Sequence, residues 1–321
     1  MNNTPSNSES SGADQSGPGA GTKVRRLLPL TVWLCSDTTP TTGADTAPSS
    51  TGVPAGQSTT SKTRLTGKGE LCATHRGRVG RELARHLISS CTREGDLVAE
   101  AFTTSEATLV AAVSAGRRGV ALVPHFPLAQ HIRLRLQSAA LTTEQLGLLA
   151  MRPCRPDQMN RALADHAGRV GLVVAAPPPY EVGGRMPKLP GSRDCPACRA
   201  DLWMLTEQQL GAFLVAAWQV LRPGGTLAIV TTARHEGGRL HDPAPRIVRQ
   251  ASLLGFRYIQ HVIALRVPVD GDSLMVQAAP GEIAELRDIQ SRALPPAVSV
   301  HADVCLFTKP RRTQSKDGEA R

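Results

Sequence analysis

Strand-like and helix-like segments alternate from about residue 77 to residue 310, and this alternation constrains the fold more than any other feature of the chain. Short runs rich in Val, Ala and Leu predict strands at residues 97–102, 118–123, 147–151, 171–176 and 226–232. Helical spacing of apolar residues predicts helices at residues 79–91, 107–116, 128–136, 156–167, 206–221 and 245–255. Because such alternation builds right-handed βαβ units, we predict an α/β fold with a doubly wound, mostly parallel sheet.

Two further strand-like segments follow the last predicted helix, at residues 256–267 and 300–309. No long helix is required between them, so they can pair antiparallel, whereas parallel neighbours need a crossover connection. We therefore expect an antiparallel edge strand at the C-terminal end of the fold.

Low-complexity segments surround this predicted domain. Residues 1–26 and 36–76 are rich in Ser, Thr, Gly and Pro without apolar periodicity, which predicts a disordered tail and a linker. Residues 27–35 lie between them and predict a docking strand, LLPLTVWLC. The domain itself is expected to cover residues 77–310, followed by a disordered charged tail at residues 311–321.

The charge and the cysteines limit the class of protein. The net charge is +10 and the pI about 9.8, with an excess of arginine spread through the body of the chain, which suits a polyanionic partner such as nucleic acid. Seven cysteines occur at irregular spacings, and no apolar run has the length of a membrane span. We expect a cytoplasmic protein with reduced thiols and without a membrane partner.

The stretch RVGLVVAAPPPYEVGG, residues 169–184, points to a site. Its β-branched run ends abruptly at Pro177, Pro178, Pro179 and Tyr180, and prolines cannot continue a strand because they lack the N–H donor. In doubly wound sheets, ligands bind beyond the carboxyl ends of the strands. Since Phe102 stands at the end of another predicted strand, we expect an active site there.

Three segments, in this order, resemble the S-adenosylmethionine-dependent DNA amino-methyltransferases, which modify N6 of adenine or N4 of cytosine. GDLVAEAFTTSEATLVAAVSAGRRGVAL resembles the cofactor segment of the family, VVAAPPPY its catalytic tetrad, and VLRPGGTLAIVTT the helix, turn and strand that follow. Residues 28–35 and the closing HADVCLFTKP are similar to an actinobacterial-type subgroup. The resemblance covers about residues 79–310 and implies the Rossmann-like methyltransferase fold, S-adenosylmethionine as cofactor and DNA as partner.

The resemblance also implies roles for individual residues. Tyr180 would stack the flipped base and the Pro178 carbonyl would orient its amine during direct in-line attack on the sulfonium methyl. The catalytic positions are Pro177, Pro178, Pro179 and Tyr180. The cofactor-binding positions are Glu100, Phe102, Thr104, Ser105, Thr108 and Val123.

Several of these positions depart from the family pattern. Pro177 lacks the side-chain acceptor of the tetrad, and Val123 stands where an acidic residue would bind the ribose hydroxyls. Thr104 and Glu106 replace glycines that let the backbone approach the cofactor, and residues 152–154 lack a further expected carboxylate. We therefore predict a DNA methyltransferase-like protein whose catalysis and S-adenosylmethionine binding are weakened or lost. The alternative is a non-catalytic nucleic-acid-binding or regulatory module that reuses the fold.

The loop after the tetrad carries two further candidates. Cys195 and Cys198 form a C-P-A-C pair, which is compatible with half of a zinc site, with reduced thiols or with a redox-sensitive pair. Four basic residues of this loop could contact phosphates or form a solvated surface: Arg185, Lys188, Arg193 and Arg199. The region leaves no room for a large target-recognition domain, so the sequence does not specify the target base, or DNA over RNA.

Overall fold

The structure is a computed structural model, and it describes residues 32–36, 79–178, 195–198, 206–236, 239–266, 269–270, 273–274 and 301–311. The predicted tail at residues 1–26, nearly all of the linker and the last ten residues lie outside these ranges. So do Pro179, Tyr180 and the four basic residues of the loop after them.

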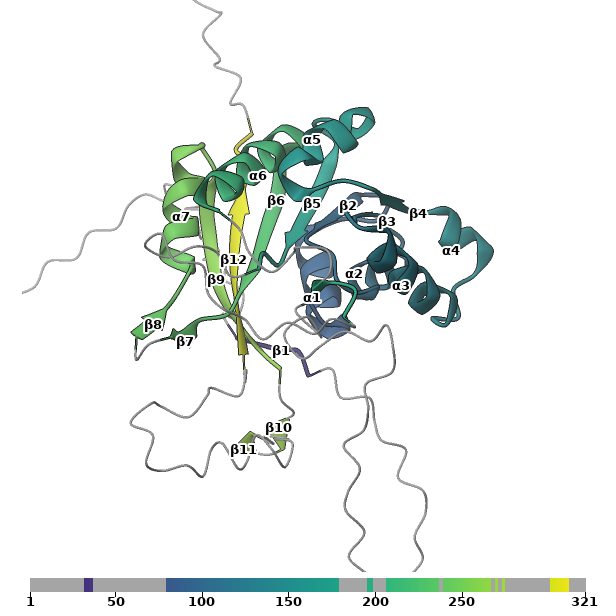
Figure 1. Cartoon of the computed structure of the whole chain (residues 1–321), viewed down its shortest axis with the longest axis horizontal. Helices are drawn as coiled ribbons and strands as arrows, with labels where there is room; N and C mark the ends of the chain where they lie inside the picture. The colour runs from purple at the N-terminus through teal and green to yellow at the C-terminus, as the bar shows by residue number, and fades with distance from the viewer. Residues whose placement is uncertain are drawn as a thin grey trace, which may run out of the picture.

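An eight-stranded sheet forms the centre of the molecule, in the order β1-β9-β12-β6-β5-β2-β3-β4 (Figure 1). Its strands are β1 (Val32–Leu34), β2 (Leu97–Ala101), β3 (Arg118–Leu122), β4 (Leu149–Arg152), β5 (Val170–Ala175), β6 (Leu221–Thr231), β9 (Arg257–Leu265) and β12 (His301–Thr308). All neighbours are parallel except β12, which is antiparallel to both β6 and β9. The predicted doubly wound, mostly parallel sheet is therefore confirmed.

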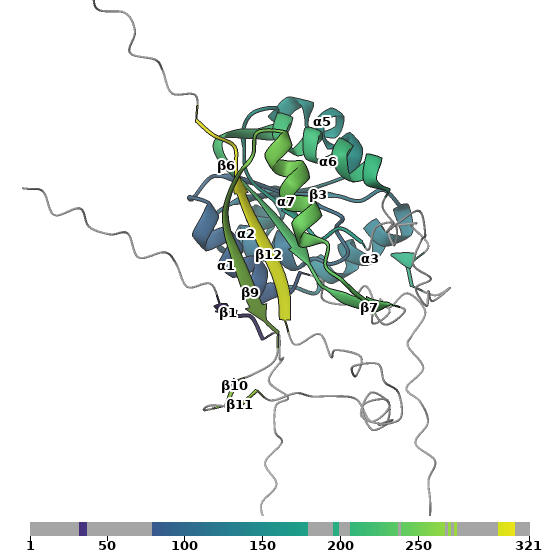
Figure 2. The same ribbon diagram turned by 90° about the vertical axis from the view of Figure 1, so that its left-hand side faces the viewer.

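The position of β12 differs from the expected edge. The strand is inserted between β6 and β9, as Figure 2 shows, and the edge beyond β9 is formed by β1. A strand inside a sheet must bury both of its faces, and Val304, Cys305, Leu306 and Phe307 are all buried. In β9, by contrast, Ile259 and Ile263 remain exposed.

Helices cover both faces of the sheet (Figure 1). On one face α1 (Arg81–Cys91) and α2 (Ala107–Ser114) pack on alternate strand residues such as Leu172 and Val174. On the other face α6 (Glu207–Val220) and α7 (Ala244–Leu253) pack on Val173 and Ala175. The alternation of partners along β5 follows the two-residue period of a strand and explains its continuous apolar sequence.

The remaining elements are short apart from α3. They are α3 (Phe126–Gln137), α4 (Thr143–Gly147), α5 (Met159–Ala162), the 3₁₀ turns η1 (Pro156–Gln158) and η2 (Ala164–His166), and the antiparallel ribbons β7 (Arg234–Glu236) with β8 (Arg239–His241) and β10 (Val269–Asp270) with β11 (Ser273–Leu274). Of the described helices, none is both long and apolar enough to cross a bilayer.

The helix predicted at residues 156–167 is divided into η1, α5 and η2. The backbone leaves the helical region at Leu163, with φ −109° and ψ 28°, and the Ala162 carbonyl accepts a hydrogen bond from the guanidinium of Arg152. Leu163 and Met159 are both fully buried, so packing has overridden the local helical preference.

Candidate functional site

The carboxyl ends of β2, β3 and β5 lie side by side and form what we call the carboxyl-terminal edge of the sheet. Ala101 pairs in register with Ala175, and Glu100 pairs with Ala121. The residues that follow these strands, Phe102, Val123 and Pro177, are thus brought to one edge. From β2 the chain winds toward β3 and β4, whereas β5 and β6 lie on the other side, so the edge contains the topological switch point.

Phe102 makes the sharp turn after β2. Its φ is +59°, a left-handed conformation that is unusual for a bulky residue and costs about 1–3 kcal/mol. The side chain is buried and packs edge-to-face on Phe213 of α6, with ring centroids 5.1 Å apart. This packing holds the turn that directs the following residues across the edge.

Glu100 is a buried acid at the end of β2. Burial raises the pKa of its carboxyl to about 8, the hydroxyls of Thr108 and Thr103 act in the opposite direction, and the charge of Glu106 adds to the rise. Within the described residues, Glu100 Oε2 is buried without a hydrogen-bond partner. At neutral pH Glu100 is therefore mainly an uncharged acid with unsatisfied hydrogen-bonding capacity.

Glu106 precedes the first turn of α2 and is engaged by arginines from two other helices. Its Oε1 accepts a hydrogen bond from Arg81 of α1 at 3.2 Å and lies 3.8 Å from Nε of Arg135 of α3. Only 8% of the Glu106 side chain is exposed. The carboxylate thus joins α1 and α3 at the N-terminus of α2, where a negative charge is favourable.

Thr104 and Ser105 complete the segment between β2 and α2. Thr104 is buried, and Ser105 Oγ accepts a weak hydrogen bond from the backbone N–H of Ala107 at 3.4 Å. The Thr103 hydroxyl donates to the Glu100 carbonyl at 3.1 Å. Side chains and their own backbone contacts therefore occupy the turn that glycines would leave open.

Val123 shares an apolar cluster with the C-P-A-C turn. It is buried together with Leu128 and Ile132 of α3, and Cys195 and Ala197 belong to the same cluster. Cys195 and Cys198 are not joined by a disulfide, and the described residues contain no group of three metal-binding side chains. The turn thus contributes apolar residues to the cluster that contains the end of β3.

Pro177 and Pro178 follow β5 directly. Pro178 is buried and Pro177 is half-buried beside the turn at Phe102. Pro179 and Tyr180 lie outside the described residues, so the stacking role of Tyr180 and the full geometry of the tetrad stay predictions.

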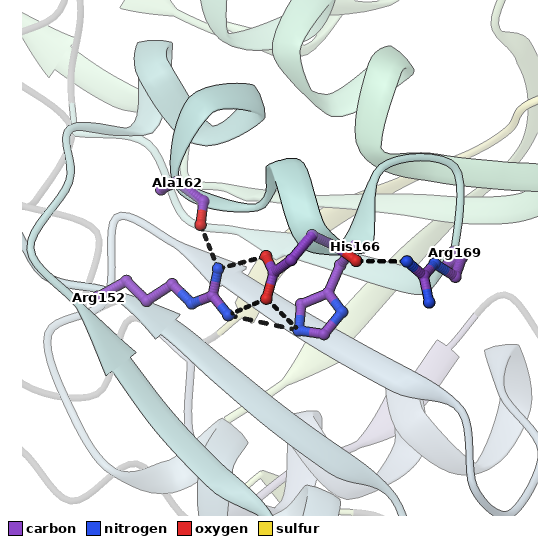
Figure 3. Close-up of polar contacts among 5 residues, drawn as sticks. Arg152, Ala162, His166 and Arg169 are labelled. Carbon is purple, nitrogen blue, oxygen red and sulfur yellow. Dashed lines mark hydrogen bonds and ion pairs between the residues drawn. The ribbon is translucent and has the colours of Figure 1, made fainter.

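A further carboxylate was expected at the end of β4, and Arg152 there pairs with the carboxylate of Asp165 (Figure 3). Its guanidinium donates two hydrogen bonds of 2.6 Å to Asp165, and these hold the pKa of that carboxyl down at about 2. Burial lowers the pKa of the adjacent His166, which contacts the same pair. Sequence reasoning missed this pair because its members are 13 residues apart.

Arg81 and Arg135 were also missed. Both lie on the surfaces of helices whose sequences are rich in arginine, and nothing in their spacing singles them out. The one sequence feature that could have indicated these arginines is Glu106, because a buried carboxylate requires a cation nearby.

The fold is that of a doubly wound α/β domain with one reversed strand. Several of the solved structures similar to it are described as methyltransferases. A putative methyltransferase of Haloferax volcanii in complex with the Trm112 activator shares 15% identity and a TM-score of 0.44, over 71% of this chain and 89% of that one. A TehB-like S-adenosylmethionine-dependent methyltransferase of Corynebacterium glutamicum shares 12% identity and a TM-score of 0.39, over 70% of this chain and 86% of that one.

A Burkholderia thailandensis 1,6-didemethyltoxoflavin-N1-methyltransferase with S-adenosylhomocysteine bound shares 14% identity and a TM-score of 0.38, over 74% and 79% of the two chains. At such identities and TM-scores, these neighbours indicate nothing about the substrate or partner of this chain. No protein-family model matches the sequence, and no curated protein matches it.

The described residues do not fit S-adenosylmethionine in the way that the resemblance implies. The carboxylate of Glu106 would repel the methionine carboxylate of the cofactor, and Thr104 fills space at the same turn. Val123 offers no side-chain acceptor for ribose hydroxyls and is buried in an apolar cluster. Only Glu100 retains an acidic group at its expected place.

Proposed function

We propose that this protein is a methyltransferase-like protein of the nucleic-acid amino-methyltransferase class in which S-adenosylmethionine binding and methyl transfer are weakened or lost. The observation that carries the proposal is the ion pairing of the buried Glu106 carboxylate with the exposed arginines Arg81 and Arg135, in the turn between β2 and α2. The register of β2 with β5, in which Ala101 pairs with Ala175, supports the assignment to the class because Phe102 and Pro177 follow these two strands at the same edge.

The loss of cofactor affinity follows from charge and space. An unpaired carboxylate in a partly buried site costs several kcal/mol, so a second anion beside Glu106 would compete for the two arginines. Thr104 adds steric opposition because its side chain is buried in the same turn. Pro177 contributes a third loss, since proline has no side-chain acceptor for a substrate amine.

Titration calorimetry of the full chain with S-adenosylmethionine and S-adenosylhomocysteine tests the proposal. We expect no binding tighter than about 50 μM for the wild type and a measurable gain, on the order of tenfold, in Thr104→Gly with Glu106→Gly. The matched control is Thr143→Gly with Glu144→Gly. It replaces the same two residue types, a threonine and a glutamate, at exposed positions at the start of α4.

Two results would overturn the proposal. Wild-type binding at about 50 μM or tighter would contradict the loss of the cofactor. The absence of any gain in the double glycine variant, once circular dichroism has shown it to be folded, would contradict the role given to Glu106 and Thr104.

The second candidate is a non-catalytic nucleic-acid-binding module, which the net charge of +10 favours. The two candidates differ in what is retained. Salt-dependent retention of DNA together with no detectable cofactor binding would support the module, whereas cofactor binding without DNA retention would exclude it.

A further inference from the structure

A cleft of about 480 Å³ lies at the opposite ends of the strands from the candidate site. Its walls are the end of α1 with the loop that follows, the first residues of β6, and Arg311 beyond the end of β12. We call it the arginine cleft, after Arg93, Arg222 and Arg311, which line it together with Ser90, Thr92 and Gly224. Because β6 begins here and the antiparallel β12 ends here, the cleft belongs to the amino-terminal edge of the sheet.

One arginine of the cleft is held rigidly. Arg222 donates two hydrogen bonds of 2.7 Å to the two carboxylate oxygens of Asp96, and the backbone N–H of Arg93 donates to the same carboxylate at 2.8 Å. Such a bidentate pair fixes the plane of the guanidinium. Asp96 thus positions Arg222 and neutralises only one of the three arginines.

The other two arginines are left for a ligand. Within the part of the chain that the structure describes, neither the Arg93 nor the Arg311 side chain is in an ion pair, and both residues are exposed. Gly224 lets Arg311 approach the turn: its φ is +80°, and a Cβ there would lie 2.9 Å from Arg311 Nε.

The end of α1 would by itself disfavour an anion, because helix C-termini carry partial negative charge. Two carbonyls at this end, however, are already engaged. The Ile88 carbonyl accepts from the backbone N–H and the hydroxyl of Thr92, and the Thr92 carbonyl accepts from Arg117 at 3.1 Å. Arg117 therefore places a positive charge at the end of the helix and adds a fourth arginine behind the wall.

The same edge is basic beyond the cleft. Arg118 is the first residue of β3, Arg257 is the first residue of β9, and Arg169 immediately precedes β5. All three are exposed. Glu94, beside Arg93, is the exposed acid of this loop and offsets one charge. The amino ends of the parallel strands thus present guanidinium groups in a row that reaches the arginine cleft.

We propose that the arginine cleft binds phosphate groups. Guanidinium groups match phosphate oxygens with paired N–H donors and stay charged at every physiological pH, and the exposed Ser90 lies within the same walls. The phosphate could belong to a free phosphoanion or to a nucleic-acid backbone that runs along the basic edge. The proposal does not depend on the cofactor, because the cleft and the carboxyl-terminal edge lie at opposite ends of the strands.

The test uses the full chain with two probes: inorganic pyrophosphate, followed by calorimetry, and a fluorescent single-stranded oligonucleotide, followed by anisotropy at several salt concentrations. The test variant is Arg93→Ala with Arg311→Ala. The matched control is Arg133→Ala with Arg161→Ala, which removes two exposed arginines from α3 and α5 and changes the net charge equally.

We expect the test variant to bind pyrophosphate about tenfold more weakly while the control binds as the wild type does. If the backbone of nucleic acid is the source, the test variant also lowers the slope of log K against log salt by about 1.4, from two lost contacts on a single strand. If only pyrophosphate binding changes, the source is a free phosphoanion.

Equal losses in both double variants would overturn the proposal in favour of a general effect of net charge. Absence of pyrophosphate and oligonucleotide binding in the wild type would overturn it as well. Should the test variant unfold, Arg311→Glu alone replaces it, with Arg133→Glu as its control, and the same outcomes decide.

Discussion

The two edges of the sheet use charge in opposite ways. At the carboxyl-terminal edge, two acids are buried: Glu100 in the uncharged form and Glu106 in a pair with Arg81 and Arg135. At the amino-terminal edge, Arg93 and Arg311 are exposed beside a cleft, and only Arg222 has a carboxylate partner. At the edge where this fold usually binds ligands, the described acids are thus buried or paired with arginines, whereas two arginines at the opposite edge are exposed beside a cleft.

This difference shows that the fold alone does not determine where a binding site lies. Strand order fixes which segments meet at each edge, but the side chains decide whether an edge is a site. A buried acid that pairs with the chain's own arginines stabilises the domain and removes a binding position in one step. Exposed arginines at the other edge contribute little to stability and remain available to a partner.

The largest expected effect concerns Glu100. Its pKa is about 8 in the folded chain and about 4.5 in the unfolded one, so the folded state binds more protons between these values and stability falls as pH rises. Wild-type stability should fall relative to Glu100→Gln by up to about 1.4 kcal/mol per pH unit over this range. Urea unfolding at pH 5, 6.5 and 8 measures the difference.

Glu144→Gln is the matched control for this experiment, because Glu144 lies exposed in the first turn of α4. Its unfolding free energy should follow the wild type at all three pH values. Parallel curves for the wild type and Glu100→Gln would contradict a buried, uncharged acid at the carboxyl-terminal edge.

A smaller effect is expected from Asp96→Asn at the other edge. The substitution removes the charged acceptor of Arg222, so the free energy of unfolding should fall by about 1–2 kcal/mol. It also removes the carboxylate beside the arginine cleft, so pyrophosphate should bind a few-fold more tightly. Urea unfolding and calorimetry measure the two changes.

The control for Asp96 is Glu82→Gln, which breaks the exposed pair with Arg85. Both its stability and its pyrophosphate affinity should stay close to the wild type. If Asp96→Asn weakened pyrophosphate binding in a folded protein, Asp96 would be part of the ligand site and not a counter-charge to it.

The smallest effect is expected from Asp165→Asn, which removes the carboxylate partner of Arg152 at the end of β4. The pKa of Asp165 lies below its ordinary value, so its contribution is present above about pH 4 and is lost as pH falls through about 2. The variant should melt slightly below the wild type at pH 6 and together with it at pH 2. An unchanged gap at pH 2 would show that the loss comes from packing.

Much of the fold could be predicted from the sequence. Strands such as β2, β3 and β5 are short apolar runs between turns, and their parallel direction follows from the helices that connect them. The position of β12 could not be predicted in the same way, because two antiparallel strands leave open which of them meets β6. The division of residues 156–167 depended on Arg152 and Leu163, which are contacts of tertiary structure.

The candidate site was predictable in its place but less so in its chemistry. The positions of Glu100, Phe102, Val123 and Pro177 at one edge followed from the strand ends. The partners of Glu106 come from α1 and α3, and two members of the apolar cluster of Val123 come from a loop more than seventy residues later. Contacts between distant segments leave no periodic pattern in the sequence, so only the structure identifies them.

The insertion of β12 has a consequence for synthesis of the chain on the ribosome. β9 is made before β12, yet within the described sheet it joins the other strands only through β12, and β1 joins only through β9. Within the described sheet, β1 and β9 can therefore join the other strands only after β12 has been made. The described sheet thus cannot be completed strand by strand from its N-terminal end onward.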